Sequence, residues 1–127
     1  MRFADLPDRL LGYTDLSTGE IVLDRSLTQV ERRCTLTHEL EHVHRGHIPT
    51  DPVLLAREED LVEQLSARRL VTLRDLIDAL LWSDRAHEVA DELWVDLPTL
   101  KARIAGLAAE ERAAIEERLD GADRWTA

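Results

Sequence analysis

Two histidines and a glutamate with metal-site spacing lie within residues 34–47 of this chain. His38 and His42 are four residues apart, and Glu39 directly follows the first histidine. Residues four apart lie on one face of an α-helix, so both imidazoles would point at the same position. Such a pair suits a tetrahedral Zn²⁺ ion, which binds a histidine nitrogen at about 2.0–2.1 Å. Glu39, about 100° further round the helix, would accept a proton from a water molecule at an open fourth position.

A third protein ligand is expected from the next helix, where Glu58 and Glu59 are neighbours. Helical periodicity slightly favours Glu58, because it lies in the middle of an apolar stripe and Glu59 lies at the edge. The stripe residues around Glu58 are Leu54, Leu61 and Leu65. Those beside Glu59 are Leu55, Val62 and Ser66. The pattern alone leaves both glutamates open.

Other residues near the motif are weaker candidates. Cys34 precedes His38 by one turn and could supply a thiolate, but a small buried residue is the favoured interpretation. His44 and His47 are expected outside the ligand shell, and His87 on a helix surface.

Capping and turn signals predict the elements that carry these residues. Residues 11–24 are typical of a hairpin, with turn residues at 17–19. Thr28 with Glu31 three positions later predicts a capping box, and Gly46 predicts the end of that helix. Further helix starts are predicted by Asp51 with Pro52, by Thr72, by Ser83, by Asp96 and in the charged segment 109–119.

The first of these helices also carries an aliphatic stripe opposite its histidines, formed by Leu36, Leu40 and Val43. We expect the stripe to pack into the core while the histidines face a cleft. The predicted fold is α+β and mostly helical: a small antiparallel β-hairpin or sheet packs on the histidine helix. Residues 1–82 would form the core, with 83–127 as a C-terminal helical segment packed on it in a single unit.

Composition limits the function classes. The 127-residue chain has a formal net charge of −10, which disfavours a protein that grips a phosphate backbone. It has one cysteine and lacks the apolar run of a signal peptide or a membrane span, so a cytoplasmic protein is expected.

Residues 87–107 could form two short helices joined at 94–96, as in a helix-turn-helix. The second helix offers only Lys101 and Arg103 as phosphate- or base-reaching groups, so direct nucleic-acid binding is disfavoured. In the last helix, three apolar residues could line up to dock a partner helix: Ala108, Ile115 and Leu119.

The sequence resembles the ImmA/IrrE zinc metallopeptidases, small gluzincin-like proteins of bacteria and phages. Residues 35–47, "TLTHELEHVHRGH", follow the family pattern Thr-Leu-x-His-Glu-Leu-x-His-x-x-x-Gly-His. A strand ending in Ile-x-Leu precedes the motif in the family, as "IVLD" at 21–24 does here. The resemblance covers roughly residues 11–106.

The resemblance also selects between the two glutamates. The family glutamate is followed by Ala at +3, an aromatic at +6, Ala at +7 and an apolar pair near +11. Counting from Glu59 gives Val62, Leu65, Ser66 and Leu70-Val71, whereas counting from Glu58 places Gln64 and Arg69 at apolar positions. Leu65 in place of the aromatic, and "Arg-Leu-Val-Thr" in place of the family's Leu-Leu-Met-Pro, are departures.

The resemblance implies Zn²⁺ held by His38, His42 and Glu59, with Glu39 as the general base. It implies a zinc-dependent endopeptidase that cleaves a specific cytoplasmic protein, such as a helix-turn-helix repressor in a phage-immunity switch. The strand at 21–24 would offer its edge to the substrate. Tyr13 and His44 are the residues considered for stabilising the oxyanion that forms during cleavage. The alternative is a non-catalytic, zinc-containing interaction module, in which Glu39 would have no use.

Overall fold

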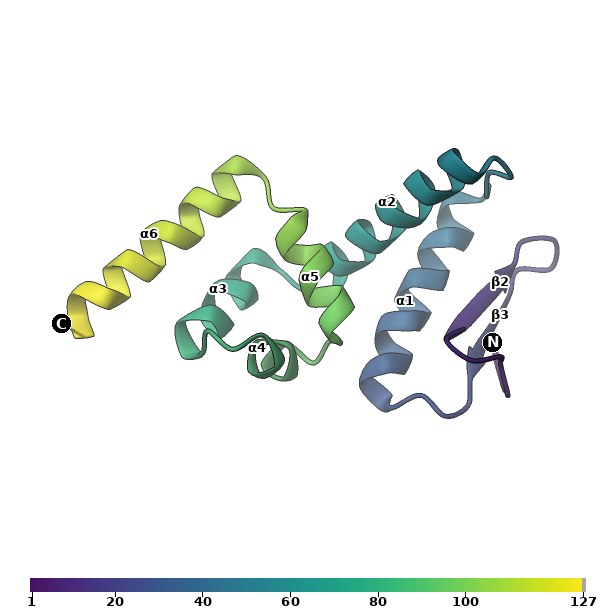
Figure 1. Cartoon of the computed structure of the whole chain (residues 1–127), viewed down its shortest axis with the longest axis horizontal. Coiled ribbons are helices and arrows are strands. Elements are labelled where there is room, and N and C mark those ends of the chain that lie inside the picture. Colours follow the sequence, from purple (N-terminus) through teal and green to yellow (C-terminus); the bar gives the residue numbers. More distant parts are fainter. Residues whose placement is uncertain (127) are drawn as a thin grey trace.

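The computed structural model describes the backbone of residues 1–126 and the side chains of residues 1–121. Its elements are β1 (Arg2–Ala4), β2 (Gly12–Asp15), β3 (Glu20–Asp24), α1 (Gln29–Arg45), α2 (Pro52–Leu70), α3 (Leu73–Trp82), α4 (Ala86–Leu93), α5 (Leu97–Ala105) and α6 (Ala109–Thr126). The α+β, mostly helical prediction is confirmed. Figure 1 shows an elongated molecule with the sheet at one end and α6 at the other.

The sheet contains the predicted hairpin and one strand that the sequence did not indicate. β2 and β3 pair antiparallel, and β1 pairs parallel with the other side of β3, in the order β1-β3-β2. β1 escaped prediction because three residues are too short to show an alternating pattern. The central position of β3 also makes one expectation wrong: both its edges are paired, so it has no edge to offer a substrate.

Local caps explain most helix boundaries. Thr28 and Glu31 form the predicted capping box of α1, and Gly46 ends the helix in the left-handed conformation, at φ 84°. Three further predicted N-caps accept backbone hydrogen bonds at α2, α3 and α5: Asp51, Thr72 and Asp96.

The predicted cap of α4 is wrong. This helix begins after Arg85, which makes no side-chain cap hydrogen bond. Ser83 instead accepts a hydrogen bond from the Arg85 backbone N–H and donates one to Glu88. Its hydroxyl therefore closes the turn before the helix.

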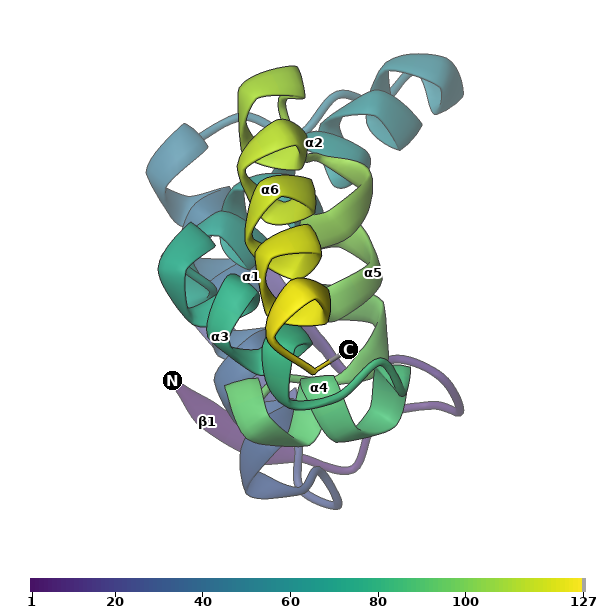
Figure 2. The same cartoon turned by 90° about the vertical axis from the view of Figure 1, so that its left-hand side faces the viewer.

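The helix α1 lies between the sheet and α2, and α2 also contacts α5 (Figure 1). Beyond them α3 contacts α4 and α6, and α4 contacts α5. Figure 2 looks at the molecule from the α6 end, with α3 and α5 behind that helix. The boundary predicted between residues 82 and 83 stays a prediction.

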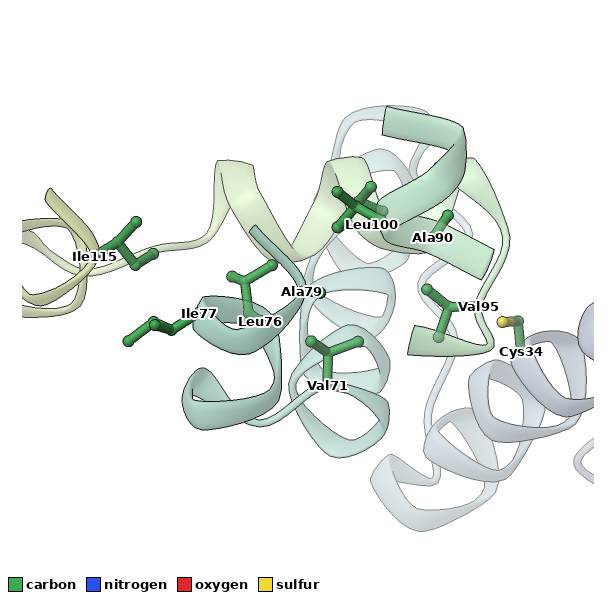
Figure 3. Packing of buried hydrophobic residues seen from close by; sticks show 10 residues of the cluster. Cys34, Val71, Leu76, Ile77, Ala79, Ala90, Val95, Leu100 and Ile115 are labelled. Atoms are coloured by element: carbon green, nitrogen blue, oxygen red, sulfur yellow. The ribbon is translucent and has the colours of Figure 1, made fainter. Parts of the chain in front are cut away.

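The larger core cluster joins α1, α3, α4, α5 and α6 (Figure 3). Its buried members are Cys34, Val71, Leu76, Ile77, Ala79, Val89, Ala90, Val95, Leu100 and Ile115. A second cluster, Ile21, Leu23 and Leu27, lies between the sheet and α1, where Leu36 packs against it.

The last helix does not offer the free docking stripe that the sequence suggested. Within α6, Ile115 and Leu119 pack on this chain's own core. Among the described helices, none is both long enough and apolar enough to cross a membrane.

The aliphatic stripe of α1 is only partly buried, which corrects the sequence-based expectation. Leu36 packs on the sheet cluster, but Leu40 is 50% exposed and Val43 39%. Helix α1 instead turns the side of Thr35, Glu39 and His42 inward, and Glu39 contacts Thr14 of the sheet. Leu40 lies about 100° further round the helix than Glu39, so the covered side of α1 is not the side that carries the aliphatic stripe.

Candidate metal centre

Three side chains from α1 and α2 converge on one point. His42 Nε2 lies 2.9 Å from Glu59 Oε1, and His38 Nε2 lies 3.1 Å from Glu59 Oε2. The three ligating atoms all lie within 4.8 Å of one another. Two imidazole nitrogens and a carboxylate oxygen are a donor set that suits a Zn²⁺ ion, so these residues fit the metal that the sequence predicts.

The helix α2 presents Glu59 rather than Glu58 to the histidines. Val62 and Ser66 are buried on the Glu59 side, whereas Leu54 and Leu61 of the predicted Glu58 stripe are exposed. The slight periodicity argument for Glu58 is therefore wrong, because α2 turns its less apolar side toward α1.

Glu58 is engaged elsewhere. Its carboxylate forms an ion pair with Arg45 at the end of α1, through both Arg45 Nε and Nη2. The hydrogen bond and charge of Arg45 lower the pKa of Glu58. Glu58 therefore ties α2 to α1 beside the site without contributing to the convergent group.

Glu63 contacts the candidate site, and the sequence analysis did not identify it. Its Oε2 lies 2.8 Å from His38 Nδ1, and this contact fixes the ring so that Nε2 points at Glu59. Burial lowers the pKa of His38, but the hydrogen bond to Glu63 and the neighbouring carboxylates outweigh it, so the pKa is raised. The signal that could have found Glu63 is its spacing of one helical turn from Glu59. His42 Nδ1 is buried with no hydrogen-bond partner among the described side chains.

Glu39 lies beside the convergent group and is only 6% exposed. The hydroxyl of Thr14 on β2 donates a hydrogen bond to Glu39 Oε2. The sheet thus holds the predicted general base, and nothing in the sequence indicated Thr14.

These groups line an open cleft of about 490 Å³ between β2, α1, α2 and the start of α5. Its apolar wall includes Leu10, Leu11, Ile48 and Pro98. The lining also includes the three convergent side chains and the predicted base: His38, His42, Glu59 and Glu39. The arrangement leaves the convergent group accessible to a ligand that enters from solvent.

The structure does not support either residue considered for stabilising the oxyanion, Tyr13 or His44. Tyr13 borders the cleft, but strand alternation places its side chain on the outer face of the sheet, where its hydroxyl neighbours Arg2. His44 and His47 are exposed and do not line the cleft, and His87 is exposed on α4.

Cys34 is buried, as the favoured interpretation predicted, and does not belong to the convergent group. Its sulfur accepts a hydrogen bond from the backbone N–H of Asp96, 3.5 Å away. Burial raises the pKa of the thiol, which disfavours a thiolate ligand.

The helix-turn-helix-like segment packs on the rest of the protein. Arg103 is 3% exposed and donates hydrogen bonds to the Val71 carbonyl and to Glu111, so it is unavailable to a phosphate. Lys101 alone of the two basic candidates is exposed. The turn has a left-handed residue, Trp94 at φ 56°, whose carbonyl accepts a hydrogen bond from Arg33.

Comparison of the chain with protein-family models, with curated proteins and with solved structures gave no match. The functional argument therefore rests on the geometry of this site and on the sequence motif.

Proposed function

We propose that this protein is a zinc-dependent endopeptidase that cleaves a specific protein. The observation that carries the proposal is the convergence of His38, His42 and Glu59 in an open cleft that Glu39 also lines. A structural zinc site is usually closed by four protein ligands. Within the described part of the chain, the group has three, which leaves a place for a reacting molecule.

A bound Zn²⁺ would polarise a peptide carbonyl and acidify a water molecule in this cleft. His38 and His42 would hold the ion from α1 and Glu59 from α2, with Glu63 orienting His38 through Nδ1. The Glu39 carboxylate would accept the proton of the attacking water and deliver it to the leaving amine. Each role is assigned to a side chain in the lining of the cleft.

The free edge of β2 is the proposed binding surface for the substrate backbone. Leu11 is hydrogen-bonded to Asp24, and the strand continues in antiparallel register with β3. The alternate residues Gly12 and Thr14 therefore direct their backbone N–H and C=O groups away from β3. An extended segment could pair with them by strand addition while its apolar side chains contact the leucines of the cleft wall.

The target is proposed from the resemblance to the ImmA/IrrE metallopeptidases: a regulatory protein of the cytoplasm, such as a helix-turn-helix repressor in a phage-immunity switch. The small cleft and the acidic surface, with a net charge of −10, suit recognition of one partner better than general digestion. Direct nucleic-acid binding is not part of the proposal, because Arg103 is buried.

The proposal is tested by replacing the base alone. Zinc-loaded native protein and Glu39→Gln are incubated with a peptide library made by digesting a bacterial proteome, and new termini are identified by mass spectrometry. The native protein should generate new termini and Glu39→Gln should not, although both bind zinc. Glu92→Gln, an exposed change on α4, is the matched control and should cleave like the native protein. Equal cleavage by Glu39→Gln, or none by the native protein, would contradict the proposal.

A further inference from the structure

The side chain of Thr14 connects the free edge of the sheet to the carboxylate of Glu39. Its hydroxyl donates to Glu39 Oε2 and also lies 3.4 Å from the backbone carbonyl oxygen of the same residue. Burying a carboxylate as deeply as that of Glu39 costs free energy unless the group is hydrogen-bonded. The hydrogen bond from Thr14 therefore restricts the orientation of this carboxylate.

The packing of β2 on α1 places the hydroxyl within reach. A Cβ atom at Gly12 would lie 2.9 Å from Thr35 Cγ2 and 2.9 Å from the Val22 carbonyl oxygen. Glycine at this position therefore allows the strand to approach the helix closely. Two residues on, Thr14 points its side chain to the same face of the sheet, toward Glu39.

We propose that Thr14 is a positioning residue for the peptidase reaction: its hydroxyl holds one oxygen of Glu39 and leaves the other directed at the cleft for proton transfer. This inference rests on the proposed function. It assigns two separate tasks to one residue, because the Thr14 backbone lies at the edge where the substrate would pair while its side chain orients the base. Removing the hydroxyl should leave the backbone task intact.

The expected signature is a fall in kcat without a rise in KM. A reacting group misplaced by about 1 Å can lose roughly 100-fold in rate, so Thr14→Val should lower kcat by about 10- to 100-fold. Thr14 does not contact His38, His42 or Glu59 through any hydrogen bond in the described chain, so the zinc content should stay native. Thr14→Ser keeps the hydroxyl and should restore most of kcat.

The experiment measures kcat, KM and zinc content on one synthetic peptide, chosen as the best-cleaved member of the proteome-derived library. Thr18→Val is the matched control, because Thr18 lies in the turn of the same hairpin and its hydroxyl serves that turn. It should lose a little stability and no kcat. If Thr14→Val does not fold, Thr14→Ala replaces it with the same expectation.

Native kcat in Thr14→Val would overturn the inference while leaving the proposed function standing. So would an equal fall in Thr14→Val and Thr14→Ser, because the hydroxyl would then not be the cause. A fall in kcat matched by loss of zinc would also overturn it, since the defect would lie in the metal site. An inactive native protein would overturn the proposed function, and this inference with it.

Discussion

Glu58 and Glu59 are chemically identical neighbours, and the packing of α2 gives them different partners. Glu59 lies against both imidazoles, whereas Glu58 pairs with Arg45. One residue along a helix is a rotation of about 100°, which is enough to separate a ligand from a surface ion pair. The role proposed for Glu59 thus depends on which side of α2 is buried.

Glu63 should contribute to metal affinity without contacting the ion. Because its carboxylate orients His38 through Nδ1, we expect Glu63→Gln to weaken zinc binding by about 10- to 100-fold. Competition with a chromophoric chelator measures the affinity, and circular dichroism checks the fold. Asp60→Asn, an exposed acid on the same helix, should bind zinc as the native protein does. Native affinity in Glu63→Gln would show that the contact is incidental.

At the scale of the element, the starts of most helices were predictable, because a capping signal acts within a few residues. Thr28, Asp51, Thr72 and Asp96 cap their helices because a side chain reaches its own backbone without help from the fold. The prediction that Ser83 caps α4 was wrong because its hydroxyl has an alternative local partner in Glu88.

Which face of a helix is buried could not be predicted in the same way. Leu40 on α1 and Leu54 on α2 are about half exposed, although each belongs to an apolar stripe. Burial depends on which side of a helix its neighbours cover, and the neighbours of α1 cover the side of Glu39 and His42 rather than that of Leu40. The motif residues His38, Glu39 and His42 were predictable from their spacing, whereas Thr14 and Glu63 depend on tertiary contacts.

The approach of β2 to α1 predicts a stability change at Gly12. Because a Cβ there would meet backbone and side-chain atoms at 2.9 Å, Gly12→Ala should lower the free energy of unfolding by about 1–3 kcal/mol. Chemical denaturation measures the change. Gly121→Ala is the matched control, since its Cβ would meet nothing within 4 Å in α6, and it should raise stability by about 0.5–1 kcal/mol. A neutral Gly12→Ala would contradict the close packing.

Across the whole molecule, Glu111 ties three helices together. It accepts hydrogen bonds from Arg68 of α2 and from the buried Arg103 of α5, and it lies on α6. Arg68, the backbone N–H of Ala108 and Arg103 lower the pKa of Glu111 from 4.5 to about 2, although burial opposes the shift. The acidic C-terminal helix α6 is thus held to α2 and α5 by charge, and to the larger core cluster by apolar packing.

This network should make stability fall in acid. A depressed carboxylate pKa contributes stability that is complete above the unfolded-state pKa and is lost as pH falls through the folded-state value. The contribution of Glu111 should therefore decline between about pH 4.5 and 2. Glu111→Gln should be less stable than the native protein at pH 7, and the difference should shrink at pH 3 and below. Glu110→Gln, its exposed neighbour, should show no such difference, and a pH-independent gap for Glu111→Gln would contradict the account.

The central claim is that His38, His42 and Glu59 form a metal site, and the zinc content of purified protein tests it most directly. Elemental analysis would compare the native chain with Glu59→Ala and Glu58→Ala. We predict about one zinc ion per native chain, lost in Glu59→Ala and retained in Glu58→Ala, because Glu58 pairs with Arg45 instead. A folded native protein that takes up no zinc when it is supplied, or a Glu59→Ala variant that keeps its zinc, would contradict the account.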